Sequence, residues 1–209
     1  MVPEPPPTPF PSGEPYWYWL GGRPALDFVN TRRERWRGLI ECLCSPADLA
    51  AWLVRAELLE RPVPATRAGL AAAQELREAI DAGVRAAVTG SAPEPGALGV
   101  IDGWLELAAP RPALLAGDGG MPRLGERAAE DPVQAALGAI ALDAARMLGR
   151  AQERERVRIC GSDTCSARFY DRSPAARRRW CSMALCGNVA KARRHRARTV
   201  VRLPNERPA

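Results

Sequence analysis

The chain has 209 residues, of which 46% are hydrophobic and 26% charged, with a formal net charge of +6 at pH 7. This size allows one ordinary domain with a small appended module, and the hydrophobic content can supply a buried core. No run of about 18 apolar residues occurs and the N-terminus is proline-rich, so we expect neither a membrane span nor a signal peptide, and a cytoplasmic location follows by default.

The first 90 residues predict an extended tail followed by helices. Residues 1–15 contain seven prolines, which lack the backbone donors that helices and sheets need. The aromatic run at 16–20 suits packing against a core, and a glycine turn follows it. Segment 45–48 reads Ser-Pro-Ala-Asp, which is typical of a helix start with Ser45 as the cap. Helical periodicity then covers 65–89.

Three further elements complete the predicted body. Apolar residues at helical spacing predict helices over 98–108 and from Asp131 to about Leu148. Between them, two short apolar runs flank a Gly-Asp-Gly-Gly turn, which predicts a β-hairpin within 111–125. Residues 16–152 are therefore expected to form a mostly helical domain.

The body shows no catalytic signature. It has no glycine-rich phosphate loop, no nucleophile motif and no acidic cluster with metal-binding spacing. His195, the single histidine, lies in a run of arginines whose positive field disfavours its protonation. Cys42 and Cys44 are interpreted as structural thiols, with a redox pair as the alternative. We expect no enzymatic activity.

Four other cysteines form two Cys-x4-Cys pairs, Cys160 with Cys165 and Cys181 with Cys186. Zinc prefers four such ligands in a tetrahedron, and two close pairs can converge on one ion. Disulfides are the alternative, but a cytosolic chain would keep its thiols reduced. The sequence therefore predicts one structural Zn²⁺.

The residues around these cysteines predict a small finger over 153–202, followed by a tail at 203–209. Segments 167–171 and 178–181 read as two strands around a Ser-Pro turn, and Ser182 can cap a helix over about 183–200. A knuckle, a hairpin and a helix that carries the last ligand make a treble-clef arrangement. The predicted fold class is thus mostly α, within α+β.

Positive charge coincides with this finger. Residues 154–209 carry 15 basic and 4 acidic side chains, whereas the preceding part has a net charge of −5. Such asymmetry is typical of a polyanion-binding module, although a solvated helix would give the same pattern. The candidate nucleic-acid contacts are Arg177, Arg178, Arg179, Lys191, Arg193, Arg194, Arg196 and Arg198.

The segment 179–195, which contains Cys181-Ser-Met-Ala-Leu-Cys-Gly-Asn-Val189, resembles the CGNR zinc-finger family of bacterial proteins. Val189 stands where the family's name tetrad usually has Arg. Residues 21–31, Gly-Gly-Arg-Pro-Ala-Leu-Asp-Phe-Val-Asn-Thr, and 45–53 resemble the helical ABATE domain that commonly precedes this finger.

The resemblance implies a stress-related transcription regulator whose finger binds DNA, most simply as a duplex. It also implies that the helical domain senses a small-molecule effector or mediates assembly, with Asn30, Arg32 and Arg35 as candidate ligand contacts; a salt-bridge network is the alternative for these three. A protein-interaction adaptor and an RNA-binding protein remain the alternative functions, and the oligomeric state is left open.

Overall fold

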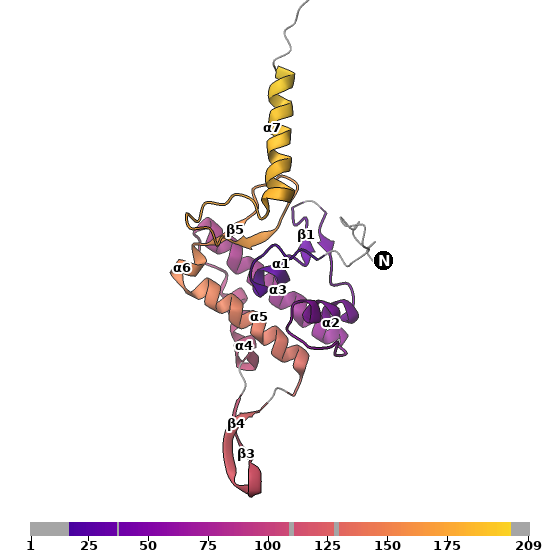
Figure 1. Ribbon diagram of the computed structural model, residues 1–209, viewed down its shortest axis with the longest axis vertical. Coiled ribbons are helices and arrows are strands. Elements are labelled where there is room, and N and C mark those ends of the chain that lie inside the picture. Colours follow the sequence, from indigo (N-terminus) through magenta and orange to yellow (C-terminus); the bar gives the residue numbers. More distant parts are fainter. Residues whose placement is uncertain (1–16, 37, 109–110, 128–129, 202–209) are drawn as a thin grey trace, which may run out of the picture.

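The computed structural model describes residues 17–36, 38–108, 111–127 and 130–201 (Figure 1). The predicted tails at 1–15 and 203–209 lie outside these ranges. The described chain is mostly helical with three short antiparallel sheets, which confirms the predicted fold class. Within it, every helix is too short or too polar to cross a membrane.

Six helices build the body. Their bounds are α1 Pro24–Val29, α2 Pro46–Arg55, α3 Arg67–Thr89, α4 Pro95–Ala108, α5 Pro132–Gly149 and α6 Ala151–Arg154. The long helix α3 packs against α4 and α5, and α1 lies across both α3 and α5 (Figure 1). Apolar stripes on these helices meet in one core, in which the ring centroids of Phe28 and Trp52 lie 5.2 Å apart. The half-exposed Trp19 ring stacks on Trp52 from outside this core.

Side-chain caps explain where the helices begin and end. Ser45 and Asp48 form a capping box at the start of α2, because each side chain satisfies the other residue's backbone N–H. Thr66 caps α3, and Asp131 caps α5 through the N–H groups of its first turn. Gly90 ends α3 at φ 71°, a left-handed conformation that favours glycine. The sequence predictions for these helices are confirmed.

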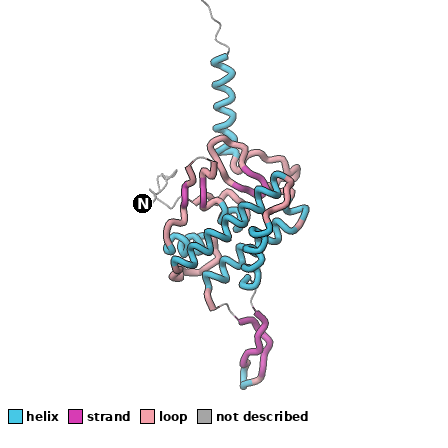
Figure 2. The backbone as a smooth tube through the Cα atoms, turned by 180° about the vertical axis from the view of Figure 1, so that it is seen from behind, coloured by secondary structure: helices cyan, strands magenta, loops and turns pink. Residues whose placement is uncertain are grey.

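In the described part of the body, the β structure consists of two small ribbons. Strand β1 (Arg32–Arg33) pairs with β2 (Ile40–Glu41), next to α1. Strands β3 (Arg111–Ala116) and β4 (Pro122–Arg127) form the predicted hairpin, which extends away from the helices (Figure 2).

The finger differs from the prediction in its strand pairing. Strand β6 (Arg168–Tyr170) pairs with β5 (Val157–Ile159), which precedes the first cysteine, and not with 178–181. Segment 178–181 is not a strand, because its backbone is used elsewhere: Arg178 N–H donates to Asp171 Oδ2, and the Arg179 carbonyl accepts from Gly161. A π-helical turn, η2 (Met183–Gly187), then leads into α7 (Asn188–Val201).

The body and the finger are joined by buried polar contacts. The Asn30 amide, at the end of α1, donates to the Arg168 carbonyl at 2.9 Å and accepts from the Arg168 N–H at 2.8 Å. The Arg168 guanidinium is itself buried and lies 2.6 Å from Asp81 of α3. Two residues along, the Tyr170 N–H donates to the Gly21 carbonyl. The first strand pair of the finger is therefore fixed against α1 and α3.

A second group of charges surrounds this junction. Buried Arg77 binds Glu41 through two 2.6 Å hydrogen bonds, and Glu78 binds Arg35 at 2.6 Å and Arg32 at 3.2 Å. Burial alone would raise the pKa of Glu78, but hydrogen bonds and charges from Arg35 and Arg77 outweigh it and lower this pKa to about 2. These side chains tie β1 and β2 to α3.

The junction predicts a specific sensitivity to the charge of Asp81. We expect Asp81→Asn to lower the free energy of unfolding by about 3 kcal/mol, because it leaves the Arg168 guanidinium buried without its counter-charge. Urea unfolding measures this. Arg85→Gln removes the exposed partner of the same carboxylate and should change stability by no more than about 0.5 kcal/mol. Equal effects of the two variants would contradict the assignment.

Candidate metal centre and basic surface

Four cysteine sulfurs converge at one point of the finger. The Sγ atoms of Cys160, Cys165, Cys181 and Cys186 all lie within 4.8 Å of one another. The Cys165–Cys181 and Cys181–Cys186 separations are 3.8 and 3.7 Å. A tetrahedron with Zn–S bonds of about 2.3 Å has S···S edges of about 3.8 Å. The four thiols therefore fit one zinc ion.

Local structure brings each ligand to this point. Cys160 follows β5, and its N–H donates to the Ala167 carbonyl, which closes the loop that carries Cys165. Cys181 precedes Ser182, whose side chain accepts from the Leu185 N–H and caps the π-helical turn. Cys186 lies within that turn. The first pair thus comes from a strand-linked knuckle and the second from a helix start, which agrees with these two parts of the treble-clef prediction but not with its hairpin of 167–171 and 178–181.

The sulfurs also perturb one another's protonation. Hydrogen bonds from Cys165 and from Cys181 favour a thiolate at Cys160 and lower its pKa. The hydrogen bond between Cys181 and Cys160 has the opposite effect on Cys181 and raises its pKa. Burial raises the pKa of Cys186 to about 12. Zinc binds thiolates, so loading the site must release the protons that the remaining thiols hold.

The candidate basic residues of the finger divide into those that contact other side chains or carbonyls of the finger and those that do not. Arg178 donates to the Cys181 carbonyl at 2.7 Å and lies over the Phe169 ring, and Arg179 lies over the Trp180 ring. Arg193 binds both oxygens of Asp163 at 2.5 and 2.6 Å. All seven candidates with described side chains are exposed, and the four that make no such contact with a described residue are Arg177, Lys191, Arg194 and Arg196. The side chains of His195 and Arg198 lie outside the described part.

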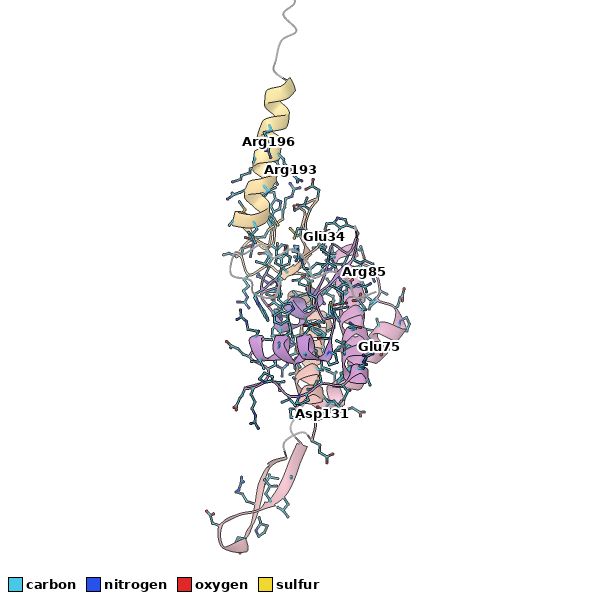
Figure 3. The ribbon with its side chains drawn as sticks, turned by 90° about the vertical axis from the view of Figure 1, so that its right-hand side faces the viewer. Glu34, Glu75, Arg85, Asp131, Arg193 and Arg196 are labelled. Carbon is cyan, nitrogen blue, oxygen red and sulfur yellow. The ribbon has the colours of Figure 1, made fainter. Side chains whose placement is uncertain are left out.

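Helix α7 holds most of this exposed charge and stands clear of the body (Figure 3). Arg193 and Arg196 are labelled along it, above the helices of the body. Its first residues continue from η2, which is its main contact in the described structure. Residues 188–201 contain no acidic side chain. This helix is therefore an accessible positive surface of the finger.

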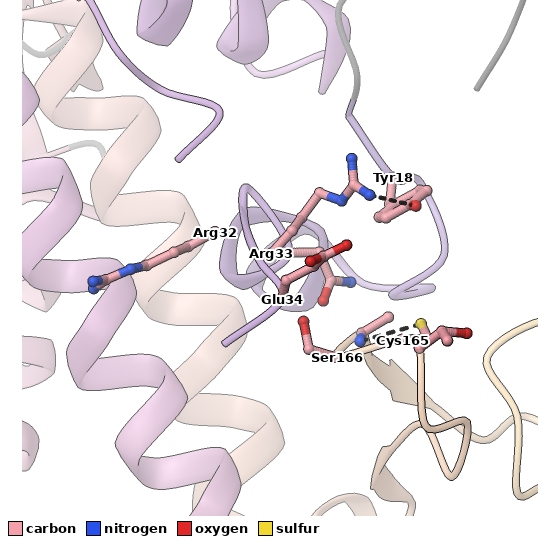
Figure 4. Close-up of a pocket in the computed structure, with 9 residues that line it drawn as sticks. Tyr18, Arg32, Arg33, Glu34, Cys165 and Ser166 are labelled. Carbon is pink, nitrogen blue, oxygen red and sulfur yellow. Dashed lines mark hydrogen bonds between the residues drawn. The ribbon is translucent and has the colours of Figure 1, made fainter. Parts of the chain in front are cut away.

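The three candidate ligand contacts lie at the junction, and each has an internal role. Asn30 holds the backbone of Arg168, while Arg32 and Arg35 pair with Glu78. A small cavity lies beside them, between β1 and the knuckle (Figure 4). It is lined by Tyr18, Asn30, Arg32, Arg33, Glu34, Thr164, Cys165, Ser166 and Ala167.

Sequence reasoning missed the residues that position the finger. Asp81 and Arg168 form a buried pair although they lie 87 positions apart, and neither belongs to a local motif. Asp163 orients Arg193 from the knuckle, 30 positions away. An aspartate at a helical position that should be buried, as at Asp81 on the core side of α3, was the available signal.

The metal centre predicts one zinc per chain. We expect purified protein to contain close to one zinc, and Cys181→Ser to lose it, because three thiolates and a hydroxyl make a poorer tetrahedral set. Elemental analysis of the folded protein measures the ratio. Cys44→Ser changes an exposed thiol outside the cluster and should retain the zinc. Well under one zinc in the native protein would contradict the site.

Two family models match the chain. The ABATE model, described as "Putative stress-induced transcription regulator", matches residues 22–151. The CGNR zinc finger model matches residues 156–199 and contains all four cysteines. No curated protein matches the chain. These matches confirm the resemblance seen in the sequence: the chain belongs to the ABATE family and carries a CGNR zinc finger after that domain.

Proposed function

We propose that this protein is a zinc-dependent transcription regulator that binds duplex DNA through its finger. The observation that carries the proposal is α7, a basic helix that projects from the zinc centre without covering the body (Figure 1). Its 14 residues span about 21 Å at about 1.5 Å per residue. The major groove of B-DNA admits a helix of this kind.

The charge distribution along α7 supports a polyanionic partner. Lys191, Arg194 and Arg196 are exposed and have no acidic neighbour on their own helix. An isolated helix of this length is marginally stable in water, so a partner that neutralises these charges would also stabilise the helix. Phosphate contacts of this sort position a protein on DNA and make its affinity depend on salt.

The zinc ion would act as a structural element of this interface. It would hold the knuckle to the segment of Cys181 and η2 that leads into α7, since both supply ligands to the same point. Asn30 and Arg168 would fix the direction of the finger relative to the body. The body is then the part left to bind an effector or to mediate assembly. Of the three candidate ligand contacts, Asn30 and Arg32 line the small junction cavity and Arg35 does not.

DNA binding predicts a measurable weakening when the α7 charges are removed. We expect the double variant Lys191→Gln, Arg194→Gln to weaken duplex binding and to reduce the slope of log K against log salt by about 2, one unit for each phosphate interaction removed. Fluorescence anisotropy with a labelled duplex over a salt series measures both quantities, using zinc-loaded full-length protein.

A matched control removes the same charge from the body. Arg67 and Arg146 are exposed on α3 and α5, so the double variant Arg67→Gln, Arg146→Gln should leave affinity and slope close to those of the wild type.

No retention of any duplex at low salt would contradict the proposal. Preference for structured RNA in competition would favour the RNA-binding alternative. If charge reversal at Arg194 abolished binding to a protein partner while duplex binding stayed unaltered, the adaptor would be favoured.

A further inference from the structure

Large apolar side chains are exposed at the start of the basic helix. Met183, Leu185 and Val189 are 46%, 47% and 40% exposed, and we call these three residues the apolar patch. The buried cluster of the finger consists of the zinc-site cysteines with Ala167 and Phe169, packed against Leu20 and Trp180, and does not include them. The patch therefore contributes little to the core of the finger.

Leu185 and Val189, two of the three patch residues, lie on the accessible side at the start of α7. Met183 folds back over Gly187, where a Cβ atom would lie 2.7 Å from its sulfur. Val189 is in the first turn of α7, and Leu185 precedes it by one turn. Val189, Arg193 and Arg196 are spaced i, i+4 and i+7, so they share one side of α7. The apolar pair of Leu185 and Val189 is thus followed on the same side of α7 by the basic residues Arg193 and Arg196.

The charge around this pair determines which partner fits it. Arg196 is exposed on the same side of α7 as Val189, Lys191 and Arg194 are exposed on its opposite side, and α7 has no acidic side chain. Arg193 is held by Asp163, which keeps its guanidinium beside the knuckle. An apolar pair at the base of a cationic helix suits a surface that presents phosphates at its edges and an apolar group between them.

Duplex DNA offers one apolar group in its major groove, the 5-methyl of thymine. When a helix enters this groove, the residues near its N-terminus contact the base edges. Leu185 and Val189 occupy that end, and the exposed cations follow along the helix toward the phosphates. We propose that Leu185 and Val189 contact thymine methyl groups, so that the finger prefers sites with thymine at this position. This inference rests on the proposed DNA binding.

The test removes single methyl groups from the DNA. Duplexes that bind the zinc-loaded full-length protein are selected from a random pool, and each thymine of the selected site is replaced in turn by deoxyuridine, which lacks only the methyl. We expect one or two positions at which affinity falls about fourfold, the effect of exposing one buried methyl-sized group. At those positions, Val189→Ala or Leu185→Ala should bind thymine and deoxyuridine duplexes equally.

Two further variants sharpen the test. Leu124→Ala truncates a leucine that is 75% exposed on the β3–β4 hairpin, at the opposite end of the molecule, and should retain the full methyl effect (Figure 1). Val189→Arg should shift the preferred base at this position from thymine toward guanine, whose O6 and N7 atoms accept from arginine.

The outcomes separate this inference from the proposed function. Salt-dependent duplex binding with no methyl-sensitive thymine would overturn the inference and leave DNA binding intact. So would a methyl effect that is unchanged in both Val189→Ala and Leu185→Ala. Failure to retain any duplex at low salt would overturn both, and the apolar patch would then be assigned to a protein partner.

Discussion

The arrangement of this protein depends on one buried contact, the Arg168 strand residue held between Asn30 and Asp81. The amide of Asn30 satisfies both backbone groups of Arg168, and the carboxylate of Asp81 neutralises its guanidinium. Burying the ion pair of Arg168 and Asp81 costs desolvation free energy, so the pair contributes more to specifying one geometry than to net stability. The finger consequently meets the body in one orientation, and the direction of α7 follows from it.

The arginines of the chain serve two opposed purposes. Arg35, Arg77 and Arg168 are buried or nearly so and pair with carboxylates of the body, where the planar guanidinium can form several hydrogen bonds at once. Those on α7 project from the molecule, and among them Arg193 is tied to Asp163. A count of basic residues therefore overstates the charge that is free of internal contacts, which among the candidates with described side chains is mainly that of Arg177, Lys191, Arg194 and Arg196.

Local signals predicted much of this fold, and contacts between distant residues were the part that they could not predict. The caps at Ser45 and Asp131 and the cysteine spacing act within a few residues, so the sequence shows them directly. Strand pairing is different: 178–181 has strand-like composition, but Asp171 captures the Arg178 N–H and leaves β5 as the partner of β6. The buried helical position of Asp81 indicates a buried charge, but no local pattern identifies Arg168, 87 positions away, as its partner.

Neighbouring residues of the tetrad 186–189 are constrained differently by the fold: Cys186 and Gly187 are buried, and Val189 is exposed. Cys186 is buried at the metal centre, and a side chain at Gly187 would require Met183 to move. Val189 is exposed and lies outside the buried cluster of the finger, so exchanging its side chain costs the fold little. A family arginine can thus be replaced at this position while the zinc finger remains intact.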